Sequence, residues 1–383
     1  MASVLGFGSE KSPPWTLSPC YASLRSADSA RPSGATSVGL VSTEPAPTPV
    51  PAPRSRLAAP GDAGAATVLA RSRDELAAAL ADAPDPRAVV MTMGALHEGH
   101  FDLVREAARR VGPAGTVVVT IFVNPLQFAP TEDLDSYPRD LEGDLAGLTR
   151  TLTGADGALG VGRLVVFAPT PEVIYPAGKP AVRIDPGPIA TVLEGRTRPT
   201  HFAGVCQVVL TLMHLTAPRW ALFGRKDAQQ LAIIESMVRD LAVPLEIVPV
   251  DIRRESDGLA MSSRNAYLSP EQRRQALALS RALRAGREAA AQPAGSGARP
   301  DPVAIRRAAL ASLEAADGVE IDYVALVDPA GFEDLTDAGL GLPRSASVRE
   351  DAGEGLPAVG LLAVAARVGT TRLIDNTLID LRP

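Results

Sequence analysis

The stretch VVMTMGALHEGHFDLV, residues 89–104, decides the fold. A short apolar run leads into a glycine, and two of the chain's four histidines, His97 and His100, follow three residues apart. A buried strand of a parallel sheet reads as such a continuous apolar run. A run of this kind followed at once by helical spacing predicts a strand that passes into a helix. We therefore expect the histidines at the end of a strand over 88–93, where a helix over 100–111 begins.

The composition predicts a packed globular body. The length of 383 residues is enough for two ordinary domains. Hydrophobic residues make up 46% of the chain, which is enough to form packed cores. The net charge of −6 and the lack of a long basic run argue against nucleic acid or an anionic membrane as the main partner. The apolar runs, such as 117–123, are too short to span a bilayer.

Cysteine usage and the start of the chain predict a cytoplasmic protein. Cys20 and Cys206 lie far apart in the sequence and form no metal or disulfide framework. The first residues lack the basic start and apolar core of a signal peptide. Residues 1–64 are rich in Pro, Ala, Ser and Gly, so we expect a disordered extension there. A translation start further downstream is the alternative.

Strands and helices alternate between residues 65 and 252. Besides the strand over 88–93, apolar runs predict strands over 115–124, 163–169, 219–224 and 245–252. Helical spacing predicts the helices between them, over 100–111, 141–152, 203–216 and 227–241. Ser72 with Glu75 predicts a capped helix before the first of these strands. The pattern predicts a doubly wound, Rossmann-like α/β domain over 65–252, whose ligands lie beyond the carboxyl ends of the strands.

The pattern changes after residue 252. Ser269 and Pro270 predict the start of a helix over 269–291, and a second helix is expected over 302–316. Strands are expected over 319–328 and within 358–380. We therefore expect a smaller α+β domain over 253–383.

The spacing of the histidine pair favours a phosphate site. Residues three apart share a helix face, and a helix N-terminus attracts phosphate through its free N–H groups and its dipole. Gly94 and Gly99 allow a ligand to approach the backbone. A zincin-type metal pair requires histidines four apart, but position 101 is Phe. A pair of capping or core histidines stays open as the alternative.

Three later segments also follow predicted strands. They are NPLQF (124–128), FGRKD (223–227) and MSSRN (261–265). Lys226 is a natural phosphate ligand with Asp227 as its partner, and the last segment offers hydroxyls and a guanidinium to a polyphosphate. Because carboxyl ends of parallel strands meet at one edge, we expect the segments to form one crevice.

Seven segments occur in the order typical of one family. They are TMGALHEGH, IFVNPLQF, EDLDSYPRD, RPTHFAGV, FGRKDAQQL, DGLAMSSRNAYLS and GTTRLIDN. The chain thereby resembles the pantothenate synthetases, or pantoate–β-alanine ligases, of the HxGH-type nucleotidylyltransferase superfamily. The resemblance implies ATP-dependent condensation of D-pantoate with β-alanine through a pantoyl adenylate, with release of AMP and pyrophosphate. It also implies Mg²⁺ and a cytoplasmic homodimer in the coenzyme A pathway.

The resemblance implies a role for each residue at a matching position. His100 is the expected proton donor, and His97, Lys226, Ser262, Ser263 and Arg264 are expected to act with it. The expected ATP site comprises Met93, Gly94, Ala95, Leu96, His97, Glu98, Gly99, His100, Gly224, Arg225, Lys226, Asp227, Arg253, Met261, Ser262, Ser263 and Arg264. Pantoate and β-alanine are assigned to Gln127, Gln230, Asn124 and Arg198, with Phe128 in the pocket wall and Tyr137 in a covering loop. Asp144 is the expected Mg²⁺ contact.

The chain departs from the family pattern at a few positions beside these residues. They are Met91, where the family usually has Pro; Gly143, in place of the first of two acidic residues; Arg225 and Ala228, in place of Glu and Tyr; and Arg253, in place of a small apolar residue. Two alternatives stay open: a nucleotidylyltransferase that stops at the adenylate or transfers AMP elsewhere, and, because of these departures, a non-catalytic nucleotide-binding relative. The two glutamines and the MSSRN segment argue against the first alternative. The second is disfavoured by the survival of His97, His100, Lys226, Asp227, Ser262, Ser263 and Arg264.

Overall fold

The predicted first strand lies inside a six-stranded parallel sheet in the computed structural model. The structure describes residues 67–129, 134–135, 137–155, 157, 159–292, 298–336 and 357–383. The extension predicted over 1–64 lies outside these residues.

The sheet places its switch point beside the histidine turn. Its strands are β1 (Thr67–Ala70), β2 (Arg87–Thr92), β3 (Thr116–Ile121), β4 (Arg163–Phe167), β5 (Trp220–Gly224) and β6 (Glu246–Val250). Their order is β1-β4-β3-β2-β5-β6, and all pairs are parallel. From β2 the chain first builds outward through β3 and β4, and then returns to add β5 and β6 on the other side. The carboxyl ends of β2 and β5 therefore flank the crevice in which this architecture binds ligands.

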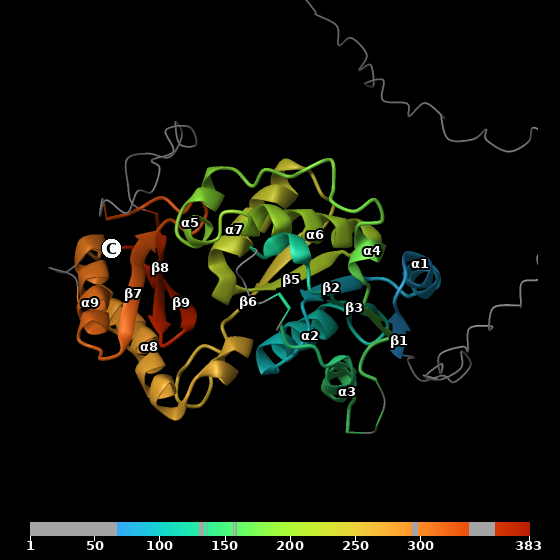
Figure 1. Cartoon of the computed structure of the whole chain (residues 1–383), viewed down its shortest axis with the longest axis horizontal. Helices are drawn as coiled ribbons and strands as arrows, with labels where there is room; N and C mark the ends of the chain where they lie inside the picture. Colours follow the sequence, from blue (N-terminus) through green and yellow to red (C-terminus); the bar gives the residue numbers. More distant parts are fainter. Residues whose placement is uncertain are drawn as a thin grey trace, which may run out of the picture. The chain divides into compact units, whose positions relative to one another are not determined.

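Successive strand residues point to opposite faces of this sheet, and helices cover both faces (Figure 1). On one face, Val89 and Val118 pack with α1 (Arg73–Ala81), α6 (His201–Thr216) and α7 (Ala228–Asp240). On the other face, Val90 and Val117 pack with α2 (Glu98–Val111) and α3 (Leu141–Leu152). The helix predicted over 100–111 begins two residues earlier, because His97 caps it.

The C-terminal part forms a second, antiparallel sheet. Its elements are α8 (Pro270–Ala290), α9 (Pro302–Glu314), β7 (Val319–Val327), β8 (Val359–Val368) and β9 (Thr371–Asp380). One face of this sheet packs against α8 and α9. The other face packs against Val192 and Leu193, which precede α5, and against Ala232 of α7. The predicted α/β class with a smaller α+β part is confirmed, whereas the boundary at residue 252 stays a prediction.

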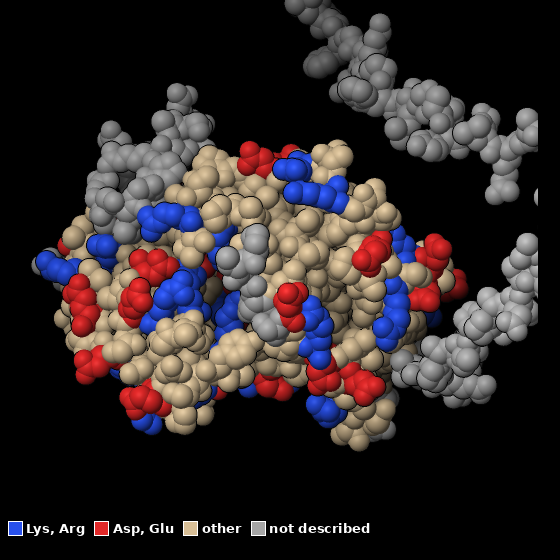
Figure 2. All heavy atoms as spheres, viewed as in Figure 1, with Lys and Arg blue, Asp and Glu red and all other residues tan. Residues whose placement is uncertain are grey.

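Six short helical turns lie between the longer elements: η1 (Pro125–Gln127), α4 (Pro171–Ile174), η2 (Pro188–Thr191), α5 (Glu194–Thr197), η3 (Arg225–Asp227) and η4 (Ser263–Tyr267). Among these described turns, η1, η3 and η4 carry predicted site residues. Basic and acidic side chains alternate over the face of the molecule in Figure 2. Among the described residues, no helix combines the length and the apolar character that crossing a membrane requires.

Candidate active site

A cleft of about 270 Å³ lies at the carboxyl ends of the central strands. It is lined by residues at and after the ends of β2, β3 and β5, by one side of α6, and by residues 251–253 and 261–264. The structure thus brings together most of the predicted site residues: Met93, His97, Gly99, His100, Gln127, Phe128, Tyr137, Arg198, Gly224, Lys226, Asp227, Gln230, Arg253, Met261, Ser262, Ser263 and Arg264.

Seven predicted site residues are not among those that line this cleft: Gly94, Ala95, Leu96, Glu98, Asn124, Asp144 and Arg225. Glu98 instead forms an exposed ion pair with Arg105, at 2.8 Å. Arg225 pairs with Asp251 at 3.2 Å. The roles assigned to these residues stay predictions.

The two histidines fix one another at the start of α2. Gly99 N donates to His97 Nδ1 at 3.2 Å, and His97 N donates to His100 Nδ1 at 3.3 Å. Because both Nδ1 atoms accept, the neutral imidazoles must carry their protons on Nε2. The rings stack with their centroids 4.1 Å apart. The capping alternative and the ligand-binding alternative are thus compatible: one ring nitrogen caps the helix and the other remains a donor.

Both imidazoles are neutral near pH 7. Burial, followed by the charge of Lys226, lowers the pKa of His97 to about 4. Burial lowers the pKa of His100 to about 3, and His97 and Lys226 act in the same direction. The pair therefore presents two N–H donors to a ligand.

Asp144 fastens the loop between β2 and the histidines. Its carboxylate accepts from Leu96 N at 2.7 Å and from Ala95 N at 3.1 Å. The loop needs this support because Gly94 and Ala95 have φ values of 87° and 52°, in the left-handed region. Only 4% of Asp144 is exposed, and burial raises the pKa of its carboxyl. Asp144 thus holds the turn from which His97 extends.

The described residues do not provide a complete protein cage for a metal. No group of three or more His, Cys, Asp or Glu side chains among them is placed to hold an ion. Both carboxylate oxygens of Asp144 already accept backbone hydrogen bonds. At the neighbouring departure from the family, Gly143, a side chain would collide with Asp140, which caps α3.

Asn124 orients Gln127 at the end of β3. Its Nδ2 donates to Gln127 Oε1 at 3.2 Å and to Gly204 O at 3.0 Å, while Tyr175 Oη donates to its Oδ1 at 2.9 Å. Gln127 Nε2 in turn approaches Met93 Sδ at 3.0 Å. Asn124 is 1% exposed and acts from behind the pocket wall, so the amide that reaches the cleft is that of Gln127.

His201 is a cleft residue that the sequence analysis missed. Its Nδ1 lies 3.1 Å from Gln127 O, and Arg198 Nη2 donates to the same carbonyl at 3.3 Å. Arg198 Nη1 lies 3.3 Å from His201 Nε2. A carbonyl only accepts and a guanidinium only donates, so Nδ1 carries the proton of His201. The signal was present in RPTHFAGV, where this histidine follows the assigned arginine by three residues.

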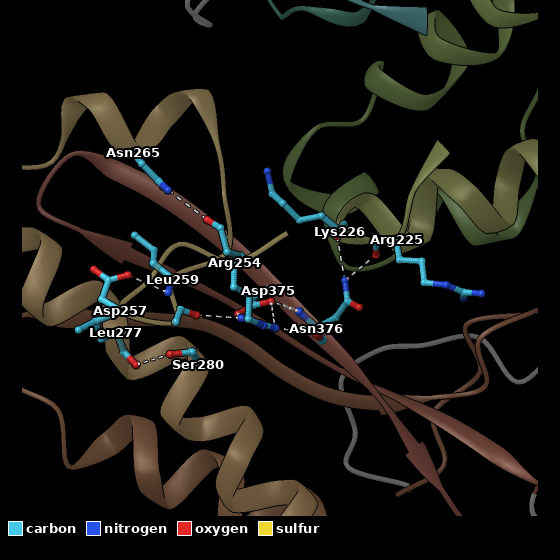
Figure 3. Close-up of polar contacts among 12 residues, drawn as sticks. Arg225, Lys226, Arg254, Asp257, Leu259, Asn265, Leu277, Ser280, Asp375 and Asn376 are labelled. Carbon is cyan, nitrogen blue, oxygen red and sulfur yellow. Dashed lines mark hydrogen bonds and ion pairs between the residues drawn. The ribbon is translucent and has the colours of Figure 1, made fainter. Parts of the chain in front are cut away.

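Lys226 enters the cleft from the turn after β5. Asn376 of β9 donates through Nδ2 to Arg225 O at 3.0 Å and to Lys226 O at 2.8 Å. The Lys226 side chain extends away from these contacts (Figure 3). Asn376 lies in the LIDN segment, and nothing in the sequence around it predicted a role in the site.

The segment over 261–264 closes the cleft from the C-terminal side. Gly99 N approaches Met261 Sδ at 3.3 Å, so this segment contacts the start of α2. Ser262 Oγ accepts from Arg264 N at 3.3 Å. Arg253, a departure from the family, pairs with Asp102 of α2 at 3.3 Å. The cleft thus presents imidazole donors, a lysine, two hydroxyls and an arginine to an anion, opposite two glutamine amides.

The chain matches known proteins over most of its length. The family model described as Pantoate-beta-alanine ligase matches residues 68–378. The pantothenate synthetase of Nocardioides sp. is 50% identical over 317 residues, which cover 81% of this chain and 85% of that protein. That of Streptomyces avermitilis is 45% identical over 354 residues, or 81% of this chain and 97% of that protein.

Solved structures agree with this assignment. The crystal structure of pantothenate synthetase from Thermus thermophilus is 41% identical, with a TM-score of 0.67 over 82% of this chain and 100% of that chain. The pantoate–β-alanine ligase of Francisella tularensis, solved with β,γ-ATP and β-alanine, is 28% identical, with a TM-score of 0.58 over 82% of this chain and 98% of that chain. This chain therefore belongs to the pantoate–β-alanine ligase family.

Proposed function

We propose that the chain condenses D-pantoate with β-alanine at the expense of ATP, through a pantoyl adenylate, and releases AMP and pyrophosphate. The observation that carries the proposal is the convergence, in one cleft, of anion-binding groups and of paired amides. His97, His100, Lys226 and the segment 262–264 supply the former, and Gln127 and Gln230 the latter. The relatives' names supply the identity of the substrates.

In this proposal the phosphates of ATP lie against the start of α2. The helix N-terminus and the two Nε2–H groups donate to phosphate oxygens, and Lys226 supplies the positive charge. Ser262, Ser263 and Arg264 bind the phosphates from the other side. An amide both donates and accepts, so Gln127 and Gln230 suit a substrate that carries hydroxyls and a carboxylate.

The first step is the attack of a pantoate carboxylate oxygen on the α-phosphorus. The bond from that phosphorus to the bridging oxygen of pyrophosphate breaks, and pyrophosphate leaves with the electron pair. Negative charge accumulates on the phosphate oxygens during this step, where preorganised N–H donors stabilise it most. Because His100 is neutral, we assign it to donate a hydrogen bond from Nε2 to the departing oxygen.

The second step uses the mixed anhydride that the first step made. The β-alanine nitrogen attacks the acyl carbon, the acyl–oxygen bond breaks, AMP departs, and the nitrogen loses a proton to form the amide. Gln127 borders the expected path of the amine. Arg198 and His201 hold its carbonyl from behind, which keeps this residue in place through both steps.

We extend the proposal to Mg²⁺, a homodimer and a cytoplasmic location, each of which follows from the family. Magnesium usually binds through substrate phosphates and one or two carboxylates, so the lack of a complete cage among the described residues fits an ion that arrives with ATP. When bound, the ion would neutralise phosphate charge.

The release of AMP and pyrophosphate by the purified chain tests the proposal. We expect turnover to require pantoate and β-alanine together, and pantothenate to form in equal amount to AMP. Continuous release with pantoate alone, unchanged by β-alanine, would identify a nucleotidylyltransferase and overturn the proposal. Two lysine variants separate an effect on the cleft from the loss of one positive charge. Lys226→Met should abolish most turnover, whereas Lys179→Met, in an exposed connecting segment that does not line the cleft, should leave it unchanged.

A further inference from the structure

One strand of the small sheet contacts both walls of the nucleotide cleft. In β9, Asp375 and Asn376 are adjacent, and adjacent strand residues point to opposite faces. Their cross-strand partners agree with this, because Val364 lies opposite Asp375 and packs with α8 and α9, whereas Ala363 lies opposite Asn376 and packs in the cluster that includes α7. Two neighbouring side chains can therefore hold two different segments.

Asn376 holds the turn that carries Lys226. Its amide nitrogen donates one hydrogen bond to Arg225 O at 3.0 Å and one to Lys226 O at 2.8 Å (Figure 3). Asn376 is only 6% exposed, so these carbonyls do not readily exchange it for water. The partner carbonyls lie 151 and 150 residues away in the sequence, and they belong to the turn from which the lysine extends.

Asp375 holds the other wall. Its carboxylate accepts from Arg254 in a bidentate pair, with Nη1 to Oδ2 at 2.7 Å and Nη2 to Oδ1 at 3.0 Å. Arg254 Nη1 also donates to Gly258 O at 3.1 Å, and residue 254 forms a β-bridge with Ala260. The arginine thereby closes the short hairpin that leads directly into residues 261–264.

The Asp375 side chain is also joined to the backbone of Asn376. Asn376 N donates to Asp375 Oδ1 at 2.8 Å, so the carboxylate accepts from both its neighbour and Arg254. Bidentate arginine–carboxylate pairs fix direction as well as distance. A short rigid chain of hydrogen bonds therefore runs from the Lys226 turn, through β9, to the hairpin that ends at Met261.

We propose that Asp375 and Asn376 form a positioning element that sets the separation between Lys226 and the 261–264 segment across the phosphates of ATP. Neither residue needs to touch the substrate, because both act through the segments that they hold. The inference rests on the proposed function, since Lys226 is assigned to phosphate there. It makes β9 the part of the small sheet on which adenylation depends.

Asn376→Leu is the main test, since it keeps the size of the side chain and removes both donors. In the pantoate-dependent exchange of pyrophosphate into ATP, we expect roughly a 10²-fold loss of rate, the cost of a misplacement of about 1 Å. The KM for pantoate should stay within about twofold, because hydrogen bonds from Asn124, Arg198 and His201 hold Gln127 in its place. Asn376→Ser, which keeps one donor, should recover part of the loss.

A double-mutant cycle separates positioning from general damage. In a Lys226→Met background, Asn376→Leu should cost less than about threefold, because the group that it positions is absent. An equal loss in both backgrounds would overturn the inference. Thr377→Val is the matched control, since this hydroxyl donates only within its own strand, to Leu378 O at 3.5 Å.

Amide exchange decides the inference independently of activity. In Asn376→Leu and Asn376→Ser, hydrogen exchange at residues 225–228 should accelerate at least tenfold, with no change at β2 or β3. Unchanged exchange in the folded variants would overturn the inference even if turnover fell. A wild-type chain without ligase activity would refute the proposed function instead. Accelerated exchange in the variants would still support the positioning element formed by Asp375 and Asn376.

Discussion

The two walls of the cleft are held in different ways. The wall that follows β2 is fastened through the backbone of its own loop: the buried Asp144 carboxylate accepts from two backbone nitrogens, and each histidine ring accepts from a nearby N–H group. The wall over 253–264 is fastened from a distance by side chains at its base, through Arg254 to Asp375 and through Asn265 to Glu255. Most groups of the second wall are only half-buried.

This difference separates two kinds of contribution. Damage to the first wall should change both stability and chemistry, because loss of the buried Asp144 carboxylate leaves loop N–H groups without partners and also displaces the imidazole donors. Damage at the half-buried Asn265–Glu255 contact of the second wall should change nucleotide handling more than stability, because such polar contacts contribute little to the free energy of unfolding.

Loss of His100 should have the largest effect. His100→Ala removes an Nε2–H donor, and we expect kcat to fall by roughly 10²- to 10³-fold, the usual cost of losing one donor to a developing negative charge. The free energy of unfolding should fall by only about 1 kcal/mol, as for a lost helix cap. His214→Ala, at an exposed position of α6, is the matched control. Near-normal turnover in His100→Ala would show that this imidazole is not needed for the reaction.

Asp144→Asn should come next. An amide can accept through only one of its two atoms, so one loop N–H loses its partner, and we expect a loss of roughly 1–3 kcal/mol in the free energy of unfolding. Turnover should fall with it because the histidine turn loosens. Glu142→Gln, exposed on the same helix, is the control. The predicted Mg²⁺ contact would show a different pattern, with unchanged stability in the absence of magnesium and a raised magnesium requirement.

The pH dependence of stability tests the first wall without disturbing the second. Burial lowers the pKa of His97 to about 4 and that of His100 to about 3, below the value near 6.5 of the unfolded chain. Below about pH 6.5 the unfolded state therefore binds more protons, and the free energy of unfolding should fall as the pH drops toward 4.

A variant that lacks His97 and His100 shows whether this pH dependence of stability belongs to the pair. His97→Asn with His100→Asn should flatten the curve between pH 6.5 and 4, whereas His214→Asn should leave it unchanged. The buried carboxyls Asp144 and Asp375 have raised pKa values and act in the opposite direction. The free energy of unfolding of wild type and variant, measured by chemical denaturation at each pH, differs only by the contribution of the two histidines. Identical slopes of this free energy against pH would contradict their assignment as buried neutral groups.

The smallest effect is expected in the second wall. Asn265 donates to Glu255 Oε1 at 2.7 Å and to Ala260 O at 3.1 Å. Asn265→Ala should raise the KM for ATP by about fivefold, which corresponds to roughly 1 kcal/mol, and should change the unfolding midpoint little. Asn265→Asp, which cannot donate to either acceptor, should behave alike. A large fall in stability with an unchanged KM would remove the distinction between the walls.

Local signals predicted much of the fold. The apolar runs and the capping residues located the strands β2 to β6 and the helices α2, α3 and α6 to α9, within a few residues. β1 was missed, because four residues offer too short a pattern to separate from a loop. The split of 358–380 into two strands depends on Gly369, whose φ of 59° allows the hairpin.

The site was predictable where the chain repeats its family's pattern, and not where contacts are remote. The cleft gathers His97, Lys226 and Ser262, as expected from their places after strands. Asp144, however, was assigned to a metal from its position alone, and its hydrogen bonds to residues 48 and 49 positions away were not foreseen. Nothing in local spacing indicates that Asn376 reaches the turn of Lys226, because that contact depends on how the small sheet packs.

The use of a histidine to begin α2 sets a limit on how far this helix can be stabilised. Ser, Asp or Asn cap helices more strongly, and a carboxylate would also complement the helix dipole. A change of His97 to Asp should therefore gain stability, but it would place an acceptor where the proposed phosphate site requires a donor. If His97 binds phosphate as we propose, selection for thermostability and selection for turnover act in opposite directions at this position.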